Sequence, residues 1–151
     1  AGIGYFSVPI GVLSKPKKIY SIELNPISFI FLKENIKINH IHNIEVINRD
    51  CREEIDKLVE KNIKADRVIM GYLPPPKEFL LWAFKIIKKN GVLHYEELIN
   101  TDKEKEEINR VVDYVRKISK ENGFDIRLLL AKKVKGYKPR VDHYVFDFMV
   151  V

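Results

Sequence analysis

Short apolar runs alternate with amphipathic segments along most of the chain, and this alternation constrains the fold more than any other feature. Runs typical of buried strands occupy 18–23, 43–48, 66–70 and 92–95. Between them, apolar residues at helical spacing predict helices over 26–38, 50–61 and about 77–88. Asn25-Pro26 supplies an N-cap and a first helical residue, whereas Asn90-Gly91 predicts a turn. Repeated βα units favour a mostly parallel sheet with helices on its faces.

The last third of the chain has a different pattern. A long amphipathic helix is predicted over about 102–122, followed by strands over 126–132 and 143–150 with no helix between them. Two such strands should pair as an antiparallel hairpin. We therefore predict an α/β fold, a Rossmann-like doubly wound sheet that is mostly parallel with an antiparallel C-terminal hairpin. Residues 1–4 resemble the turn after a strand, so we expect the first strand to be missing and 1–151 to be one N-terminally truncated domain.

The composition limits which binding partners and which cellular compartment the protein can have. The net charge is +6, which is compatible with a polyanionic partner. Cys51 is the single cysteine, so an internal disulfide is excluded and a reducing cytoplasm is expected. Apolar runs fall short of the roughly 18 residues of a membrane span. His40, His42 and Cys51 lack the spacing of a zinc site, so no metal is expected.

Several residues with ligand-binding chemistry follow predicted strands or turns. Gly2 and Gly4 form a G-x-G that can approach a ligand closely, but the third glycine of a dinucleotide fingerprint and a P-loop lysine are absent. Glu23 ends a strand about 20 residues later, where a carboxylate can accept both hydroxyls of a ribose. The alternative is a solvated carboxylate at a strand end.

The next two strand ends offer further contacts. Asp50 and Glu53 match a capping box, and the Asp50 carboxylate could also accept an adenine amino group while the Cys51 amide meets the ring. The run 71–76 contains three prolines and can wall a pocket, with Tyr72 available for stacking on a planar substrate. A stiff loop before a helix is the alternative.

At this point the residues resemble a known family, the tRNA position-37 enzymes, which comprise guanine-N1 methyltransferases and wybutosine-synthesising aminocarboxypropyl transferases. The resemblance rests on Ala1-Gly2-Ile3-Gly4-Tyr5-Phe6 and on stretches 19–26, 32–39, 50–52, 65–72, 134–139 and 143–148. It implies a fold that binds S-adenosylmethionine as co-substrate. The residues expected to bind it are Ala1, Gly2, Gly4, Tyr5, Phe6, Glu23, Leu24, Asp50, Cys51 and Gly71.

One departure and one further resemblance help to choose between the branches. The methyltransferase branch carries Asn-Leu-Pro after the fourth strand, whereas this chain has Met70-Gly71-Tyr72-Leu73-Pro74. The run 92–96 also resembles a motif of the aminocarboxypropyl branch. The resemblance therefore favours transfer of the 3-amino-3-carboxypropyl group to carbon 7 of 4-demethylwyosine in tRNA-Phe. The alternatives are guanine-37 N1-methylation and a non-catalytic RNA-binding or nucleoside-binding module.

Candidate substrate contacts gather near the C-terminus. The stretch 132–140 contains no acidic residue and is predicted to be a basic loop that contacts tRNA phosphates and stacks on bases. A solvated hairpin loop is the alternative. No catalytic residue is assigned, because the base attacks the sulfonium donor directly, and His94 is interpreted as structural; a monomer is expected. The substrate-binding residues predicted are Tyr72, Pro74, Lys135, Tyr137, Lys138 and Arg140.

Overall fold

A computed structural model describes residues 1–73 and 76–151. Pro74, one of the predicted substrate contacts, lies outside these residues. The chain divides into two compact units, Ala1–Lys57 and Leu58–Val151. We describe each unit by itself, and a single domain over 1–151 stays a prediction.

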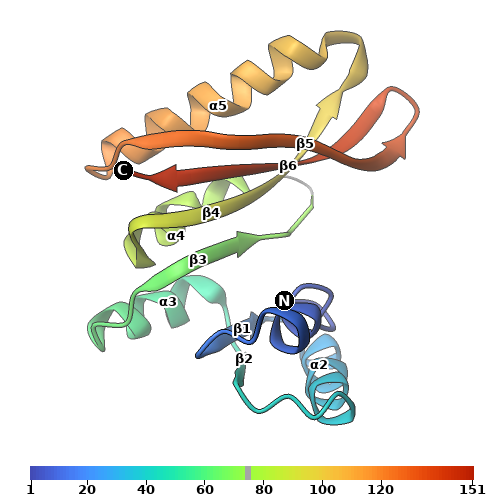
Figure 1. Cartoon of the computed structure of the whole chain (residues 1–151), viewed down its shortest axis with the longest axis vertical. Helices are drawn as coiled ribbons and strands as arrows, with labels where there is room; N and C mark the ends of the chain where they lie inside the picture. The colour runs from blue at the N-terminus through green and yellow to red at the C-terminus, as the bar shows by residue number, and fades with distance from the viewer. Residues whose placement is uncertain (74–75) are drawn as a thin grey trace. The chain divides into compact units, whose positions relative to one another are not determined.

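The first unit is built around a parallel pair of strands. β1 (Ile19–Glu23) pairs with β2 (Ile44–Asn48) from Ile19↔Ile44 to Glu23↔Asn48, and α2 (Pro26–Ile38) connects them (Figure 1). The predicted N-cap is confirmed, because the Asn25 side chain accepts hydrogen bonds from the amides of Ile27 and Ser28. α3 (Cys51–Glu60) follows β2 and runs across the boundary between the units.

One helical segment was not predicted. Ser7–Pro9 (α1) and Ile10–Ser14 (η1, a π-helix) form consecutive helical turns before β1. The segment is short and contains Pro9 and Gly11, so its helical periodicity is weak in the sequence. Gly11 is required by packing, because a Cβ there would lie 2.8 Å from Cγ2 of Ile41.

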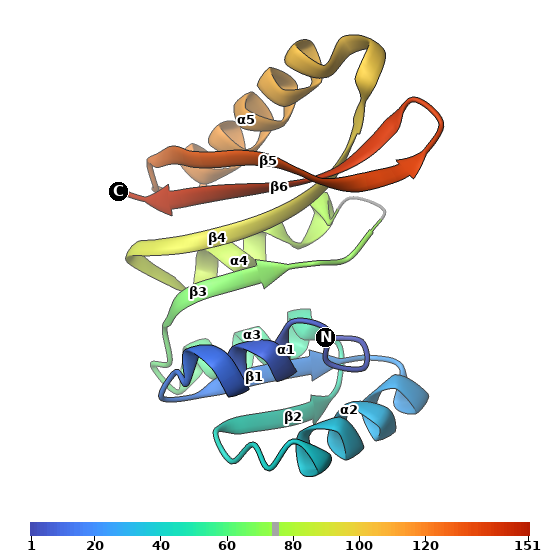
Figure 2. The same ribbon diagram turned by 45° about the vertical axis from the view of Figure 1, so that its right-hand side comes forward.

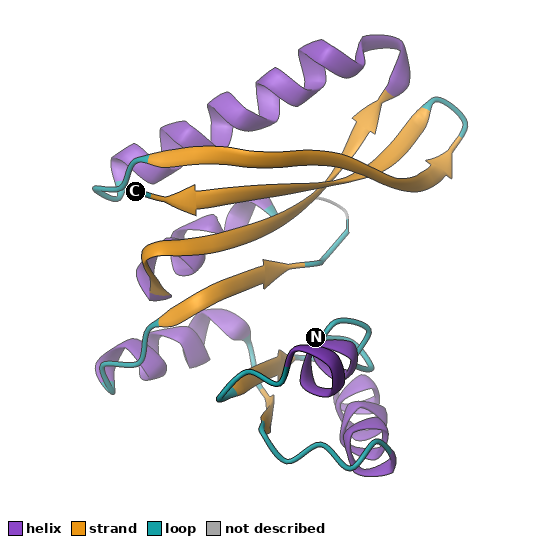
Figure 3. Cartoon of the chain, viewed as in Figure 1, coloured by secondary structure: helices purple, strands orange, loops and turns teal. Residues whose placement is uncertain are grey.

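The second unit is a mixed four-stranded sheet in the order β3-β4-β6-β5 (Figure 3). The β3–β4 pair is parallel, whereas β4–β6 and β5–β6 are antiparallel, so the predicted C-terminal hairpin is confirmed. Among the described residues the strands form two sheets, one of β1 and β2 and one of β3, β4, β6 and β5. The elements of this unit are β3 (Ala65–Met70), η2 (Lys77–Phe79), α4 (Leu80–Ile86), β4 (Ile87–Asn100), η3 (Thr101–Lys103), α5 (Glu104–Glu121), β5 (Ile126–Lys138) and β6 (Val141–Val150).

None of the described helices in either unit is long and apolar enough to cross a membrane.

The boundary between α4 and β4 differs from the prediction. The helix ends at Ile86, and Ile87 is already extended and opposite Ala65 of β3. The turn predicted at Asn90-Gly91 lies within β4 as an irregularity, since the register moves from Ala65↔Ile87 to Arg67↔Val92. A Cβ on Gly91 would lie 2.8 Å from the carbonyl oxygen of Lys88, so the irregularity needs glycine there.

The core of the second unit lies on one face of its sheet. Residues of β6 alternate strictly between partly buried and buried, so one side of the strand faces α4 and α5 (Figure 2). This alternation fixes the register of β6, because a shift by one residue would turn Phe146 and Phe148 to the other face. The fully buried side chains of this core include Phe84, Leu93, Tyr95, Val111, Val115, Phe146 and Phe148.

Candidate cofactor site and basic hairpin

The glycine turn at the start of the first unit has the backbone that its residues predict. Gly2 and Gly4 both have positive φ, 59° and 106°, which side chains disfavour. A Cβ on Gly4 would also lie 2.9 Å from Cγ2 of Val8 and 3.0 Å from Cδ1 of Leu32. Glycine is thus required at Gly4 by both conformation and space, and its contact with a cofactor stays a prediction.

Glu23 connects the end of β1 to this turn. Its Oε2 accepts a hydrogen bond from the Gly2 amide at 2.6 Å, and its Oε1 accepts one from the Asn25 amide at 2.8 Å. Partial burial opposes ionisation, whereas the hydrogen bonds from the Asn25 and Gly2 amides favour the carboxylate, and the pKa of Glu23 is lowered. Each carboxylate oxygen can accept two hydrogen bonds, and Oε1 accepts one, from Asn25. Oε1 can therefore still accept a hydrogen bond from a ribose hydroxyl.

Three polar residues that the sequence interpretation missed hold the turn in place. The Asn35 side-chain amide donates to the carbonyl oxygen of Ile3 at 2.8 Å, from the middle of α2. The hydroxyls of Ser7 and Ser21 are buried and 2.7 Å apart. A polar residue inside a helix was the available signal for Asn35, since such residues weaken a helix unless they have a partner.

Asp50 has a second role that was not predicted. Its Oδ1 accepts the Arg52 amide at 2.8 Å, which confirms that it caps α3. The Arg52 guanidinium also pairs with both carboxylate oxygens, with Nη2 2.6 Å from Oδ2. These bonds lower the pKa of Asp50, whereas burial and the Asp50 charge raise the pKa of the Cys51 thiol, which favours the neutral thiol.

The tips of β1 and β2 are tied together, which brings Glu23 and Asp50 to neighbouring strand ends. The Asn48 side-chain amide donates to the carbonyl oxygens of Glu23 and Leu24 at 2.8 and 3.1 Å. Large apolar side chains of the same unit are exposed, Leu24 by 66% and Tyr5 by 78%. Most of the predicted cofactor residues, Ala1 to Cys51, therefore belong to one unit.

Gly71 and Tyr72 belong to the second unit, where they follow the last residue of β3, Met70. The Tyr72 ring makes an edge contact with Phe79, with centroids 6.3 Å apart and planes at 86°. The ring is 61% exposed, so a face remains for stacking. Its contact with a substrate base stays a prediction.

The loop predicted over 132–140 is wrong. β5 continues to Lys138 and pairs with β6 until Lys138↔Val141, which leaves Pro139 and Arg140 as the turn. Three register shifts accommodate the extra residues of β5, the last two within this stretch. Lys135, Tyr137 and Lys138 therefore lie on the last residues of β5, which is the edge strand of the sheet, since β6 beside it also pairs with β4. We call this end of β5, together with the turn at Arg140, the basic arm, and Arg140 pairs there with Asp102 at 3.5 Å.

His94 connects three strands of the second sheet. Its Nδ1 lies 2.6 Å from Oδ1 of Asp147, and its Nε2 lies 2.9 Å from Nη1 of Arg67. A guanidinium only donates, so Nε2 accepts and the hydrogen of this imidazole is on Nδ1, directed at Asp147. Both ring nitrogens are occupied, which agrees with a structural role for His94.

Parallel βα units with a glycine turn and acidic strand tips define an α/β fold of the Rossmann-like class, here with antiparallel strands at the C-terminal edge. Within that class, the chain belongs to the family of the TRM5/TYW2 methyltransferase domain, and residues 1–127 match this family.

Known relatives resemble this chain along almost its whole length. A tRNA(Phe) (4-demethylwyosine(37)-C(7)) aminocarboxypropyltransferase of Methanocaldococcus jannaschii is 40% identical over 147 residues, 97% of this chain and 56% of the relative. A tRNA (guanine(37)-N(1))-methyltransferase Trm5b of Pyrococcus abyssi is 30% identical, over 99% of this chain and 42% of the relative. The chain thus spans about half the length of these curated relatives.

Solved structures show the same fold. The crystal structure of M. jannaschii TYW2 in complex with AdoMet superposes with a TM-score of 0.87 at 37% identity, covering 99% of this chain and 65% of that one. The predicted α/β fold with antiparallel C-terminal strands is therefore confirmed at this level.

Proposed function

We propose that this protein transfers the 3-amino-3-carboxypropyl group of S-adenosylmethionine to carbon 7 of 4-demethylwyosine at position 37 of tRNA-Phe. The observation that carries the proposal is Gly71-Tyr72 directly after β3, where the methyltransferase branch is expected to have Asn-Leu-Pro. The relative that is 40% identical and named for this reaction supports it. We place the reaction in the cytoplasm together with its tRNA substrate, and reducing conditions there would keep Cys51 a free thiol.

The first unit supplies the residues for the co-substrate. S-adenosylmethionine contributes a sulfonium whose attached carbons are open to displacement. The glycine turn and Glu23 would hold the ribose, and Asp50 with the Cys51 amide would hold the adenine. Leu24, Tyr5 and Phe6 expose apolar surface that suits the faces of the nucleoside.

The chemistry needs positioning more than a dedicated nucleophile. The bond between sulfur and the γ-carbon of the aminocarboxypropyl group breaks as carbon 7 forms its new bond, and the hydrogen on carbon 7 leaves as a proton. The rate then depends on holding the base in line with the sulfonium. Tyr72 is the residue that we assign to stacking on this base, because its ring is largely exposed.

The basic arm at the end of the edge strand β5 is proposed to contact the tRNA backbone. Lys135, Lys138 and Arg140 place positive charge along the arm and at its tip, and Tyr137 is half-exposed beside them. Lysine and arginine side chains that neutralise RNA phosphates release the counterions condensed on the RNA, and this release favours binding. An exposed tyrosine can stack on an unpaired base.

One assay distinguishes the candidate functions. The protein is incubated with tRNA that carries 4-demethylwyosine and with S-adenosylmethionine labelled in either the carboxyl or the methyl carbon. Carboxyl label in the RNA is the expected result. Methyl label would instead establish methylation, the second candidate, and retained tRNA binding without either label would indicate a binding module.

A further inference from the structure

A pocket lies in the first unit, at the end of β1 and β2 opposite to Glu23. It is lined by the turn after η1 and by the segment that leads into β2, and it has a volume of about 380 Å³. These segments precede the first residues of β1 and β2, so a strand length of ~16 Å separates the pocket from the strand tips. The lining residues are Gly11, Val12, Lys15, Asn39, His40, Ile41, His42 and Asn43.

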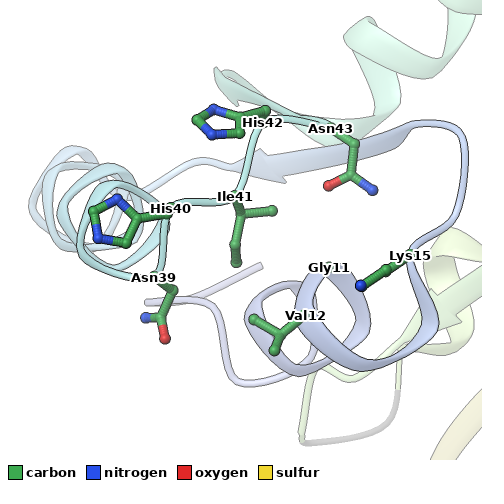
Figure 4. A pocket seen from close by; sticks show the side chains of 8 residues that line it. All are labelled: Gly11, Val12, Lys15, Asn39, His40, Ile41, His42 and Asn43. Atoms are coloured by element: carbon green, nitrogen blue, oxygen red, sulfur yellow. The ribbon is translucent and has the colours of Figure 1, made fainter.

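The pocket has an apolar floor, and Lys15 places a positive charge on its rim. Figure 4 shows Val12 and Ile41 projecting into its middle, with Lys15 and the two histidines around the edge. None of its lining residues, all of them described, is acidic, and Lys15 has no ion-pair partner in the described part of the chain. A planar ring suits such a floor, and an anion suits such a rim.

Asn43 adds an unused hydrogen-bond acceptor. Its side-chain Nδ2 donates to the carbonyl oxygen of Pro16 at 2.6 Å, which fixes the orientation of the amide. Its Oδ1 is buried and has no partner among the described residues, and Figure 4 shows this oxygen on the side of Ile41. A buried acceptor without a partner is costly, and an exocyclic amino group of a nucleobase would satisfy it.

Two helices end beside the pocket in left-handed caps. Lys15 follows η1 and His40 follows α2, with φ of 44° and 52°. The amides of His40 and Ile41 donate to the carbonyl oxygens of Lys37 and Ile36, so the positive φ of His40 belongs to the helix cap. Gly11 allows the floor to close, because a Cβ there would overlap Ile41.

We propose that this pocket binds a phosphorylated nucleoside, with its base on Val12 and Ile41, its amino group at Oδ1 of Asn43 and its phosphate at Lys15. The site is separate from the proposed cofactor site, so it holds whether or not the transfer reaction does. The ligand is either a free nucleotide or a nucleotide of an RNA chain, because both present the same chemistry.

The test is amide chemical-shift mapping of the ¹⁵N-labelled protein, with saturating S-adenosylmethionine added to occupy the cofactor site. AMP, adenosine and a short single-stranded oligoadenylate are titrated separately. We expect AMP to shift residues 11–15 and 39–43, and adenosine to bind more weakly. Oligoadenylate that binds more tightly than AMP identifies RNA as the source, and equal or weaker binding identifies the free nucleotide.

Matched variants decide the role of the pocket. Lys15→Gln should weaken AMP binding about tenfold, because it removes a charge-assisted contact. Lys17→Gln, which removes the same charge from an exposed residue outside the lining, should change binding less than about twofold. Val12→Asp, at a half-exposed position that tolerates a polar side chain, should abolish binding. The proposal is overturned if no probe shifts these residues, or if Lys15→Gln binds AMP as the unaltered protein does.

Discussion

The Gly2 amide donates to Oε2 of Glu23 at 2.6 Å, and this contact joins a turn near residue 1 to the tip of a strand 21 residues later. One carboxylate therefore both shapes the glycine turn and faces the place where a ribose is proposed to bind. Substitution of Glu23 consequently affects fold and binding together, and an informative variant must keep its shape.

Glu23→Gln keeps this shape but removes the charge and turns one acceptor into a donor. We expect the affinity for S-adenosylmethionine to fall about tenfold or more, since hydrogen bonds to a charged group contribute about 1.5–3 kcal/mol. Isothermal titration calorimetry measures the affinity, with Glu34→Gln on the exposed surface of α2 as the control. Unchanged affinity would remove Glu23 from the site.

Asp50→Asn separates helix capping from adenine recognition. Asparagine caps helices about as well as aspartate, so unfolding free energy should change by less than about 0.5 kcal/mol. The amide loses the ion pair with Arg52 and has one acceptor oxygen, so cofactor affinity should fall about tenfold. Urea unfolding and calorimetry measure the two effects. A loss of stability without loss of affinity would make Asp50 a capping residue only.

Gly4→Ala tests the steric requirement of the turn. The positive φ alone costs about 1 kcal/mol, and the overlap with Val8 and Leu32 should bring the loss of stability above about 2 kcal/mol. Gly123→Ala is the control, because Gly123 has φ 79° but nothing within 4 Å of the added Cβ. Equal losses in urea unfolding would show that packing at Gly4 is unimportant.

The basic arm is tested by replacing Lys135, Lys138 and Arg140 with glutamine. The triple variant should bind tRNA more weakly, and the slope of log affinity against log salt should fall by up to about 3. Filter binding at several salt concentrations measures both. A variant with Lys105, Lys117 and Lys120 of α5 replaced has the same net charge and should behave like the unaltered protein. If both triple variants lose affinity equally, the arm has no special role.

Glu97 gives a stability prediction that depends on pH. It is 1% exposed, and burial raises the pKa of its carboxyl, although the Leu98 amide at 3.1 Å opposes the shift. The folded state then holds the proton more tightly than the unfolded state, so stability falls as pH rises from the unfolded pKa through the folded one. Glu97→Gln, neutral at all pH, should be more stable by about 1 kcal/mol at neutral pH and equal in acid.

Thermal unfolding at several pH values checks this prediction. Glu60→Gln, at an exposed carboxyl, is the control and should follow the unaltered protein at every pH. A Glu97→Gln protein that is less stable at neutral pH would show that the ionised carboxylate is favourable in the core.

Local patterns in the sequence determined most of the elements and the reasons for them. The Asn25 cap, the strands around Ile22 and Val46 and the antiparallel pair at the C-terminus all depend on residues a few positions apart, whose periodicity and capping chemistry are readable directly. The glycine turn was predicted in the same way, because a positive φ is a property of single residues.

Tertiary structure decided how these pieces pair. It extended β5 to Lys138, gave Asp50 an arginine partner and joined His94 to Asp147, 53 residues away. Hydrogen bonds between distant strands and side chains depend on which surfaces meet after folding, and a local pattern contains no information about a partner so far along the chain.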